Sequence, residues 1–516
     1  MMAVLWPYLF FVLFACCAFA NALSHPFVHD EIVLILQNPH IAHFGDLLRA
    51  FLAPTVSLAD ANAYYRPMLE LIYRLEYFFF NFDPFWWHLF NVILHGINAA
   101  LVMRLLTLVG FFRSIALATA LLFAVHPVQT ESVACVAGIS NLLMGFFVLL
   151  SLMAYVRDYK VRAIVYFLLA LMTKEQAIFA IALFALIDWY RGRKQFLWLG
   201  GIALATLLFL SWRQAVTGSH IIGDILASPG ELKLRLLSIA KVTLTNIRML
   251  ILPYDLHYYR STDILSVHWS WWFEALIVFL AMLRLRLRSI WFGFGFFILA
   301  LSPVLNIIPL VNEYSLIMTM EHFLYVPMVG IMLILVCLIT RYCRKHAEQI
   351  FLIALSGFFF ITWIQNEYWQ SEIVLFERMV VYEPDFARGQ YLLAGAYYRN
   401  KDYALANEHF ARAYAIMEGY SRKAVGAKAQ DFLRGFKRDI LSDWAHSYDA
   451  MGYWQLSQMK YEQAISIDGH DPKLWYNLGV SYVHMGKANE AVIYFERALQ
   501  VDPGFTLARQ YLQQIK

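Results

Sequence analysis

The triplet His29-Asp30-Glu31 places two acidic side chains directly after the first apolar run of the chain. A carboxylate held at a membrane surface can accept the proton of a hydroxyl group. The hydroxyl oxygen then attacks a carbon such as the anomeric carbon of a sugar. Asp30 and Glu31 are therefore candidates for a general base. The alternative explanation is an ordinary pair of solvated loop acids.

Basic residues suited to a phosphate lie in two other segments. Arg66 follows Tyr64 and Tyr65, and a guanidinium can contact a phosphate through two parallel hydrogen bonds. Lys174-Glu175 interrupts a run that is otherwise apolar from 163 to 187. Charges at mid-membrane would cost about 3 kcal/mol each, and a turn at the membrane surface avoids this cost. The pair is therefore expected in a turn at an aqueous face.

Two further polar segments separate apolar runs. One begins at His126 and reaches Glu131, with Asn141 downstream, and the other is Glu321-His322. Taken singly, each has a structural explanation that is at least as good as a functional one. Their expected location on one side of the membrane favours a common site.

The composition identifies the solvent of most of the chain. Of the 516 residues, 60% are hydrophobic, 17% are aromatic and 15% are charged, which is too apolar for an ordinary soluble protein. Charged residues are sparse before about residue 365 and frequent after it. We therefore predict a membrane domain at 1–365, a connector at 366–385 and a water-facing domain at 386–516.

Charge and cysteine content disfavour some classes of function. A formal net charge of +4 without a long basic run argues against nucleic acid as a partner. The five cysteines show neither a disulfide framework nor the paired spacing of a metal site. These patterns require no cofactor. The acidic pair is compatible with a divalent cation, but nothing in the sequence sets a ligand geometry.

Apolar runs that can enter a bilayer alternate with short basic clusters. By the positive-inside rule these clusters mark five inner turns, at Arg113, 157–162, 191–194, 284–288 and 341–345. Five turns imply about eleven spans, with cores at 3–23, 86–109, 114–127, 142–156, 162–173, 177–190, 196–212, 271–283, 289–309, 325–340 and 348–364. Residues 1–23 also resemble a signal peptide, but no Lys or Arg precedes the apolar run, so a retained first span is expected.

The apolar stretch 234–252 is expected outside this set of spans, because counting it would place the cluster at 284–288 on the outer side. Lys241 and Arg248 share one face of a helix there, as in a helix lying in the membrane interface, although snorkelling from a packed helix explains them equally well. The polar segments described above and the C-terminal domain then share the outer side.

The C-terminal domain contains a helical repeat. Residues 471–504 match the tetratricopeptide signature, with weaker copies at 386–419 and 437–470. The signature positions of the strongest copy are Trp475, Leu478, Gly479, Tyr482, Ala491, Phe495, Ala498 and Pro503. The expected fold is all-α: a polytopic membrane domain followed by an α-solenoid of about three repeats. Such a solenoid presents a concave surface to peptides or proteins.

Several sequence blocks, taken in order, resemble the transmembrane-and-tetratricopeptide protein O-mannosyltransferases and their bacterial relatives, which belong to the GT-C superfamily. The resemblance rests on FVHDEIVLILQNP at 27–39, YYRPMLELIYRLEY at 64–77, DPFWWHLFNVILH at 83–95, LLFAVHPVQTESVA at 121–134, LMTKEQAI at 171–178, LILPYDLHYYRSTD at 250–263 and EHFLYVPMVG at 321–330. It extends over almost the whole chain.

The resemblance implies an inverting transfer of a hexose, mannose in the family, from a polyprenyl phosphate to a hydroxyl. The expected acceptor is a Ser or Thr of a protein on the periplasmic or luminal face. It assigns Asp30 as the base, Glu31 as the second acid, and Arg66, Lys174 and Arg260 to the carrier phosphate. The chain departs from the family where Glu31 replaces an Asp, Gln129 a His and His322 an Arg. Ile139-Ser140-Asn141 also occupies a place usually held by Arg and an acid.

Two other classes of function compete with this interpretation. A transporter or flippase for a lipid-linked glycan would use the same polar residues along a path, although transporters typically show repeated halves and polar residues near the bilayer midplane. A non-catalytic scaffold would use only the repeats, to recruit proteins to the membrane.

Overall fold

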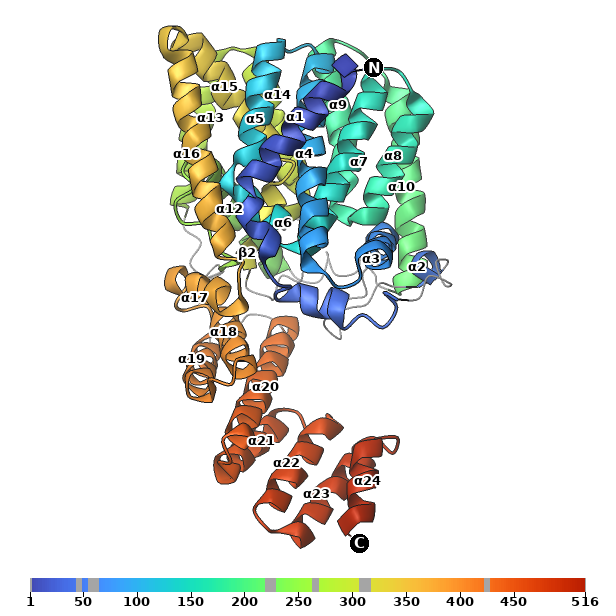
Figure 1. Ribbon diagram of the computed structural model, residues 1–516, viewed down its shortest axis with the longest axis vertical. Helices are drawn as coiled ribbons and strands as arrows, with labels where there is room; N and C mark the ends of the chain where they lie inside the picture. The colour runs from blue at the N-terminus through green and yellow to red at the C-terminus, as the bar shows by residue number, and fades with distance from the viewer. Residues whose placement is uncertain are drawn as a thin grey trace. The chain divides into compact units, whose positions relative to one another are not determined.

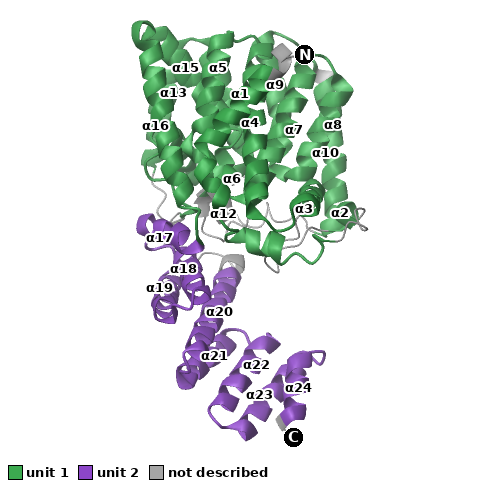
Figure 2. Ribbon diagram, viewed as in Figure 1, with its two compact units in different colours: residues 1–313, 318–371 green, residues 314–317, 372–516 purple. Residues whose placement is uncertain are grey.

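The computed structural model describes residues 2–42, 49–53, 65–218, 229–261, 269–305, 317–421 and 427–515. The chain forms two compact units, shown in green and purple in Figure 2: residues 1–313 with 318–371, and residues 314–317 with 372–516. Among the described residues the only strands are β1 (Arg260–Ser261) and β2 (Ile317–Thr319). The predicted all-α class is confirmed.

The first unit is built from apolar helices. Each of the eleven predicted spans contains one helix: α1 (Met2–Ala18), α4 (Pro84–Val109), α5 (Arg113–Val125), α7 (Ile139–Val156), α8 (Lys160–Thr173), α9 (Ala180–Arg191), α10 (Phe196–Thr217), α13 (Ser270–Leu285), α14 (Arg288–Leu301), α15 (Met328–Tyr342) and α16 (Ala347–Glu367). Within the described ranges, four helical segments are long and apolar enough to cross a membrane: Pro84–Val109, Val136–Val156, Trp198–Thr217 and Arg344–Glu367. The unit is thus an apolar helical bundle, and the number of spans stays a prediction.

Further elements carry the polar segments between these helices. They are α2 (Arg49–Leu52), α3 (Pro67–Phe80), α6 (Thr130–Val133), α12 (Pro229–Ile251) and the 3₁₀ turns η6 (Glu175–Phe179) and η10 (Glu321–Leu324). Pro67 stands in the first turn of α3, where its missing N–H is not needed. In Figure 1, α2 and α3 lie at the end of the bundle opposite the start of α1.

The first helix is part of the core of this unit. Phe11, Ala15 and Ala18 of α1 are fully buried. Gly96 of α4 lets the two helices approach closely, because a Cβ there would lie 2.5 Å from the Cα of Val12. Asn366 Nδ2 donates to the carbonyl oxygen of Ala18 at 3.0 Å. Helix α1 therefore packs as part of the helical unit, and its retention stays a prediction.

Three of the five predicted basic turns lie close to one another. Arg191 Nη1 and Arg193 Nη1 lie 3.2 and 3.5 Å from the carbonyl oxygen of Val156. Arg288 donates to the carbonyl oxygen of Trp189. The turns at 157–162, 191–194 and 284–288 therefore gather at one end of the bundle.

The second unit is a stack of helix pairs, drawn from orange to red in Figure 1. It comprises α17 (Glu372–Tyr382), α18 (Ala387–Arg399), α19 (Tyr403–Ser421), α20 (Ala427–Ala450), α21 (Trp454–Ile467), α22 (Pro472–His484), α23 (Ala488–Val501) and α24 (Thr506–Ile515). A Cβ on Gly479 would lie 2.7 Å from the Phe495 ring, which explains the small residue in the signature. The predicted repeats fall on the helix pairs α18–α19, α20–α21 and α22–α23, although α20 begins ten residues before the predicted start of the second repeat at 437.

Candidate functional site

Arg66 and Glu175, predicted from separate segments, form a bidentate ion pair. Arg66 precedes α3, and Glu175 begins η6. The distances are 3.2 Å from Nε to Oε2 and 2.9 Å from Nη2 to Oε1. Burial alone would raise the pKa of Glu175, but the nearby Arg66 and, to a smaller extent, Arg213 outweigh burial and lower it to about 2. Glu175 is therefore ionised and holds the plane of the Arg66 guanidinium.

Lys174 lies beside this pair and is buried at 5% exposure. Its Nζ donates a hydrogen bond, 2.7 Å long, to Oδ1 of the neutral Asn141, which lies in the first turn of α7. Burial, followed by the positive charge of Arg66, lowers the pKa of Lys174 to about 7. An added anion would therefore stabilise the protonated form of this amino group.

Glu131 and His322 form a second pair that joins α6 to η10. Glu131 Oε1 lies 2.6 Å from His322 Nδ1, and Oε2 accepts the backbone N–H of His322 at 2.8 Å. Burial raises the pKa of Glu131, but His322 outweighs this and lowers it. Because the ionised carboxylate can only accept, Nδ1 carries the proton, and a neutral ring then has Nε2 as its acceptor. The Glu131 charge also acts on Lys174, which connects the two pairs.

Arg260 and Glu321 are buried at the edge of the same group of residues. Arg260 Nη2 donates to the carbonyl oxygen of Asp255 at 2.7 Å and lies 3.9 Å from Glu321 Oε1. Asp255 also accepts from Arg248 Nη2 at 2.8 Å. Arg260 is therefore held mainly by Asp255, a residue that sequence reasoning had not selected, and Arg248 of the expected interfacial helix faces the same acid.

Asp30 is the accessible acid of the triplet, because 38% of its side chain is exposed. Its Oδ1 lies 3.2 Å from His29 Nε2, and the His29 ring meets the Tyr258 ring edge-on at 5.3 Å between centroids. Burial raises the pKa of Tyr258, and the charges of Tyr259, Asp30 and Glu131 raise it further. Tyr258 thus lies within electrostatic reach of both Asp30 and the Glu131–His322 pair.

Glu31 differs from its neighbour in every respect that matters for chemistry. It is fully buried, Oε2 accepts the backbone N–H of Val28 at 2.7 Å, and Oε1 accepts that of Val136. Burial raises its pKa to about 7, against the effect of these hydrogen bonds. Glu31 therefore ties the first polar loop to the segment that precedes α7, and its contacts are structural.

Both ring nitrogens of His126 are engaged by backbone groups. Its ring is fully buried, Nε2 lies 3.0 Å from the carbonyl oxygen of Leu250, and Nδ1 accepts from the backbone N–H of Val128 at 3.1 Å. These contacts link α12 to the turn after α5, and a substrate contact at His126 stays a prediction.

Sequence reasoning missed Arg213, which lies near the end of α10 and whose charge acts on Glu175. The available signal was its position directly after the apolar run 196–212. Within the described residues, no three or more His, Cys, Asp or Glu side chains are grouped so that they could hold a metal ion.

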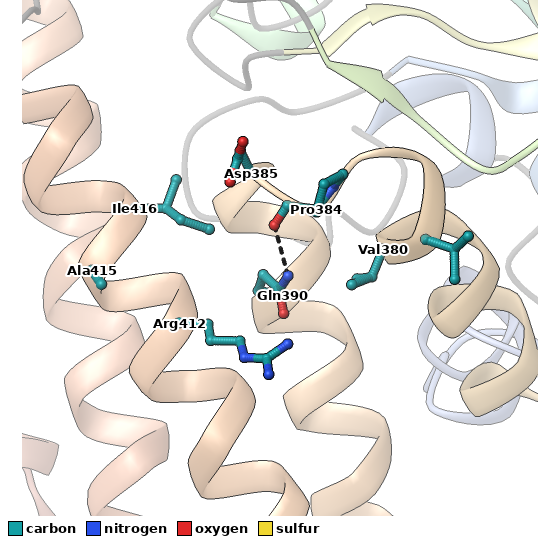
Figure 3. Close-up of a pocket in the computed structure, with 8 residues that line it drawn as sticks. Val380, Pro384, Asp385, Gln390, Arg412, Ala415 and Ile416 are labelled. Atoms are coloured by element: carbon teal, nitrogen blue, oxygen red, sulfur yellow. Dashed lines mark hydrogen bonds between the residues drawn. The ribbon is translucent and has the colours of Figure 1, made fainter.

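The repeat unit contains an open cleft of about 630 Å³ between α17, α18 and α19 (Figure 3). Apolar side chains form much of its lining, and Asp385 and Arg412 add one charge of each sign. The lining residues are Val380, Val381, Pro384, Asp385, Gln390, Arg412, Ala415 and Ile416. Gln390 Nε2 donates to the carbonyl oxygen of Pro384 at 2.8 Å and closes the turn between α17 and α18.

Comparison with known proteins identifies a repeat family and several relatives of the chain. The tetratricopeptide repeat family matches residues 375–420 and 472–505. The protein O-mannosyl-transferase TMTC1 of Mus musculus is 36% identical over 150 residues, which is 28% of this chain and 16% of that protein. The protein O-mannosyl-transferase Tmtc2 of Drosophila melanogaster is 29% identical over 292 residues, covering 50% and 31% of the two chains.

A third relative, protein O-mannosyl-transferase F38B6.6 of Caenorhabditis elegans, is 29% identical over 184 residues, or 34% of this chain and 27% of that protein. In each case the match spans less than a third of the relative's length. The resemblance drawn from the sequence blocks is confirmed by these relatives and by the repeats. The chain is thus a relative of the transmembrane and tetratricopeptide-repeat protein O-mannosyl-transferases.

Proposed function

We propose that this protein is an integral-membrane, inverting glycosyltransferase that moves a hexose, mannose in its relatives, from a polyprenyl phosphate to a hydroxyl of a protein. The observation that carries the proposal is the combination of an accessible carboxylate, Asp30, with two cations, the partly buried Arg66 and the buried Lys174, on loops of the same helical unit. Acid and cations are the two kinds of group that this reaction needs. The reacting face is the periplasmic or luminal one.

In the proposed reaction, the acceptor oxygen forms a bond to the anomeric carbon while the bond from that carbon to the phosphate oxygen breaks. Asp30 takes the proton of the acceptor hydroxyl. The polyprenyl phosphate leaves with one more negative charge than it carried as the diester. Arg66 and Lys174 stabilise this developing charge more than they stabilise the bound donor, and this difference lowers the barrier.

Glu175 and Glu131, the acids that pair with Arg66 and His322, have a supporting role in this proposal. Glu175 holds the Arg66 guanidinium through two hydrogen bonds, so little orientational freedom is lost when a phosphate binds. Glu131 orients His322 through both its ring and its backbone, which directs the remaining ring nitrogen toward donor or acceptor. The repeat unit supplies the surface for the protein acceptor, as solenoids of this kind commonly bind peptides.

The test uses purified protein in lipid nanodiscs, a polyprenyl-phosphate mannose donor and peptides that contain Ser and Thr. Asp30→Asn should lower kcat by about 10²–10⁴-fold, the usual contribution of a general base, while donor binding stays unchanged. Full retained activity would remove Asp30 from the role of base.

Asp83→Asn is the matched control. Asp83 is exposed and caps α4 by accepting from the Phe85 N–H at 3.1 Å, a role that Asn fills equally well. This variant should keep full activity. If the wild-type protein instead moved a lipid-linked sugar across a membrane without any transfer to peptide, the transporter alternative would replace the enzyme.

A further inference from the structure

Arg213 is a buried cation, and among the described residues two of its guanidinium nitrogens have no hydrogen-bond partner. It is 9% exposed, near the end of α10. Its Nε and Nη1 atoms are buried and have no hydrogen-bond partner among the residues that the structure describes. Burying a guanidinium with unpaired N–H groups is costly, and natural proteins retain such a group where an anion completes it.

The neighbouring acid is already engaged. Glu175 is the carboxylate on which Arg213 acts, yet each of its two oxygens accepts a hydrogen bond from Arg66. Lys174 adds a third cation, and its Nζ is bonded to the neutral oxygen of Asn141. Glu131 also acts on Lys174 but is bound to His322. Among the described residues, the three cations Arg66, Lys174 and Arg213 therefore share the two carboxylates Glu131 and Glu175, which leaves an excess of positive charge when Lys174 is protonated.

The helix that carries Arg213 also offers a surface for a lipid tail. The segment Trp198–Thr217 is long and apolar enough to cross a membrane, and only 22% of its apolar window is buried. Leu204, Leu208 and Trp212 are 59%, 64% and 47% exposed, and their spacing of four residues places them on one helix face. Trp212 Nε1 donates to the Tyr65 hydroxyl at 2.9 Å, as is typical of a tryptophan at the membrane interface.

Resting on the proposed function, we infer that Arg213 is a further binding residue for the phosphate of the lipid carrier, whose tail lies along the exposed face of α10. Arg213 directly follows Trp212 in the chain, so a phosphate beside Arg213 would lie next to this exposed apolar face. A phosphate there supplies the acceptor atoms that Arg213 lacks. A soluble phosphate would use the same cations but not the apolar face, so the two sources of phosphate can be separated.

The experiment measures binding of undecaprenyl phosphate to the full chain in nanodiscs of neutral lipid. Arg213→Gln should weaken binding by about tenfold or more, as expected for a lost charged hydrogen bond. Arg213→Lys should weaken it less, because the charge is kept. Inorganic phosphate should bind far more weakly than the lipid phosphate, and undecaprenol, which has no phosphate, should not distinguish Arg213→Gln from the wild type.

Arg113→Gln is the matched control, since Arg113 is exposed at the start of α5 and is predicted on the inner side. It should bind undecaprenyl phosphate as the wild type does. The melting temperature of the lipid-free protein separates a binding role from a structural one: Arg213→Gln should leave it unchanged or raise it. Equal binding by Arg213→Gln and wild type, or a loss of stability without a loss of binding, would overturn the inference.

The outcome is independent of the transfer reaction. If Arg213→Gln loses lipid-phosphate binding and the wild type transfers no sugar, the proposed function fails and the Arg213 site stands. If transfer is detected but Arg213→Gln binds the lipid phosphate normally, the proposed function stands and the Arg213 site fails.

Discussion

At the scale of single residues, two adjacent acids have different environments. Asp30 is partly exposed beside His29, and Glu31 is fully buried against backbone N–H groups. Lys174 is the residue whose charge state is most sensitive to its surroundings, because burial and the nearby Arg66 lower its pKa to about 7. These differences arise from contacts with segments that are distant in the sequence.

Binding of a phosphodiester donor should weaken as the pH rises from 7 to 9. Lys174 loses its proton above its pKa of about 7, and with it a positive charge that favours the anionic donor. The dissociation constant should increase by at most about tenfold per pH unit, the limit for one linked proton. A phosphodiester does not titrate in this range. Burial lowers the pKa of His322, so the charge of His322 changes at lower pH.

Lys174→Arg is the variant that isolates this effect, because a guanidinium stays protonated throughout the range. Its donor affinity, measured at constant ionic strength, should be almost independent of pH from 7 to 9. Parallel pH profiles for Lys174→Arg and the wild type would assign the pH dependence to another group.

At the scale of secondary structure, close helix contacts depend on small residues. Gly96→Ala should lower the melting temperature, because the new Cβ would lie 2.5 Å from the Cα of Val12 in α1 and backbone cannot move aside cheaply. Overpacking of this kind costs about 1–3 kcal/mol. Measurement in detergent, followed by intrinsic fluorescence, suffices to detect it.

Gly200→Ala provides the comparison, since nothing lies within 4 Å of a Cβ built at Gly200 of α10. This variant should be neutral or stabilising by up to about 1 kcal/mol, the difference in helix propensity. Equal melting temperatures for the two variants would show that α1 is not packed against α4 as described.

At the scale of the whole molecule, the two units divide the proposed work. Val381→Asp should raise KM for a protein or peptide acceptor and leave donor binding unchanged, because Val381 is 75% exposed and lines the cleft of the repeat unit. A charge on an apolar contact surface weakens binding by desolvation. Transfer rates at varied acceptor concentration give the measurement.

Ile493→Asp makes the same kind of change on α23, where Ile493 is 64% exposed and lies outside the lining of that cleft. It should leave KM unchanged. If both variants raise KM equally, the acceptor does not use the cleft between α17 and α19.

Much of the fold was predictable because its signals are local. Apolar runs and basic clusters predicted eleven helices at the observed places, and one repeat signature located the solenoid. Residues 420–436 do not fit the repeat period, and their sequence is compatible with either an extra helix or a loop. The structure places 427–436 within α20, while 422–426 lie outside the described residues.

The sequence by itself determined which residues are polar where apolar ones are expected, and which loops share a side: Arg66, Lys174, Glu131 and His322 follow from this. Only the tertiary structure decided their partners, because hydrogen bonds such as Arg66–Glu175 join residues 109 positions apart. The tertiary structure also decided that Asp30 is exposed and Glu31 is buried, and that His126 contacts backbone groups. It placed Arg213 within electrostatic reach of Glu175. Burial and pairing are properties of packed helices, and a linear pattern of residue types does not contain them.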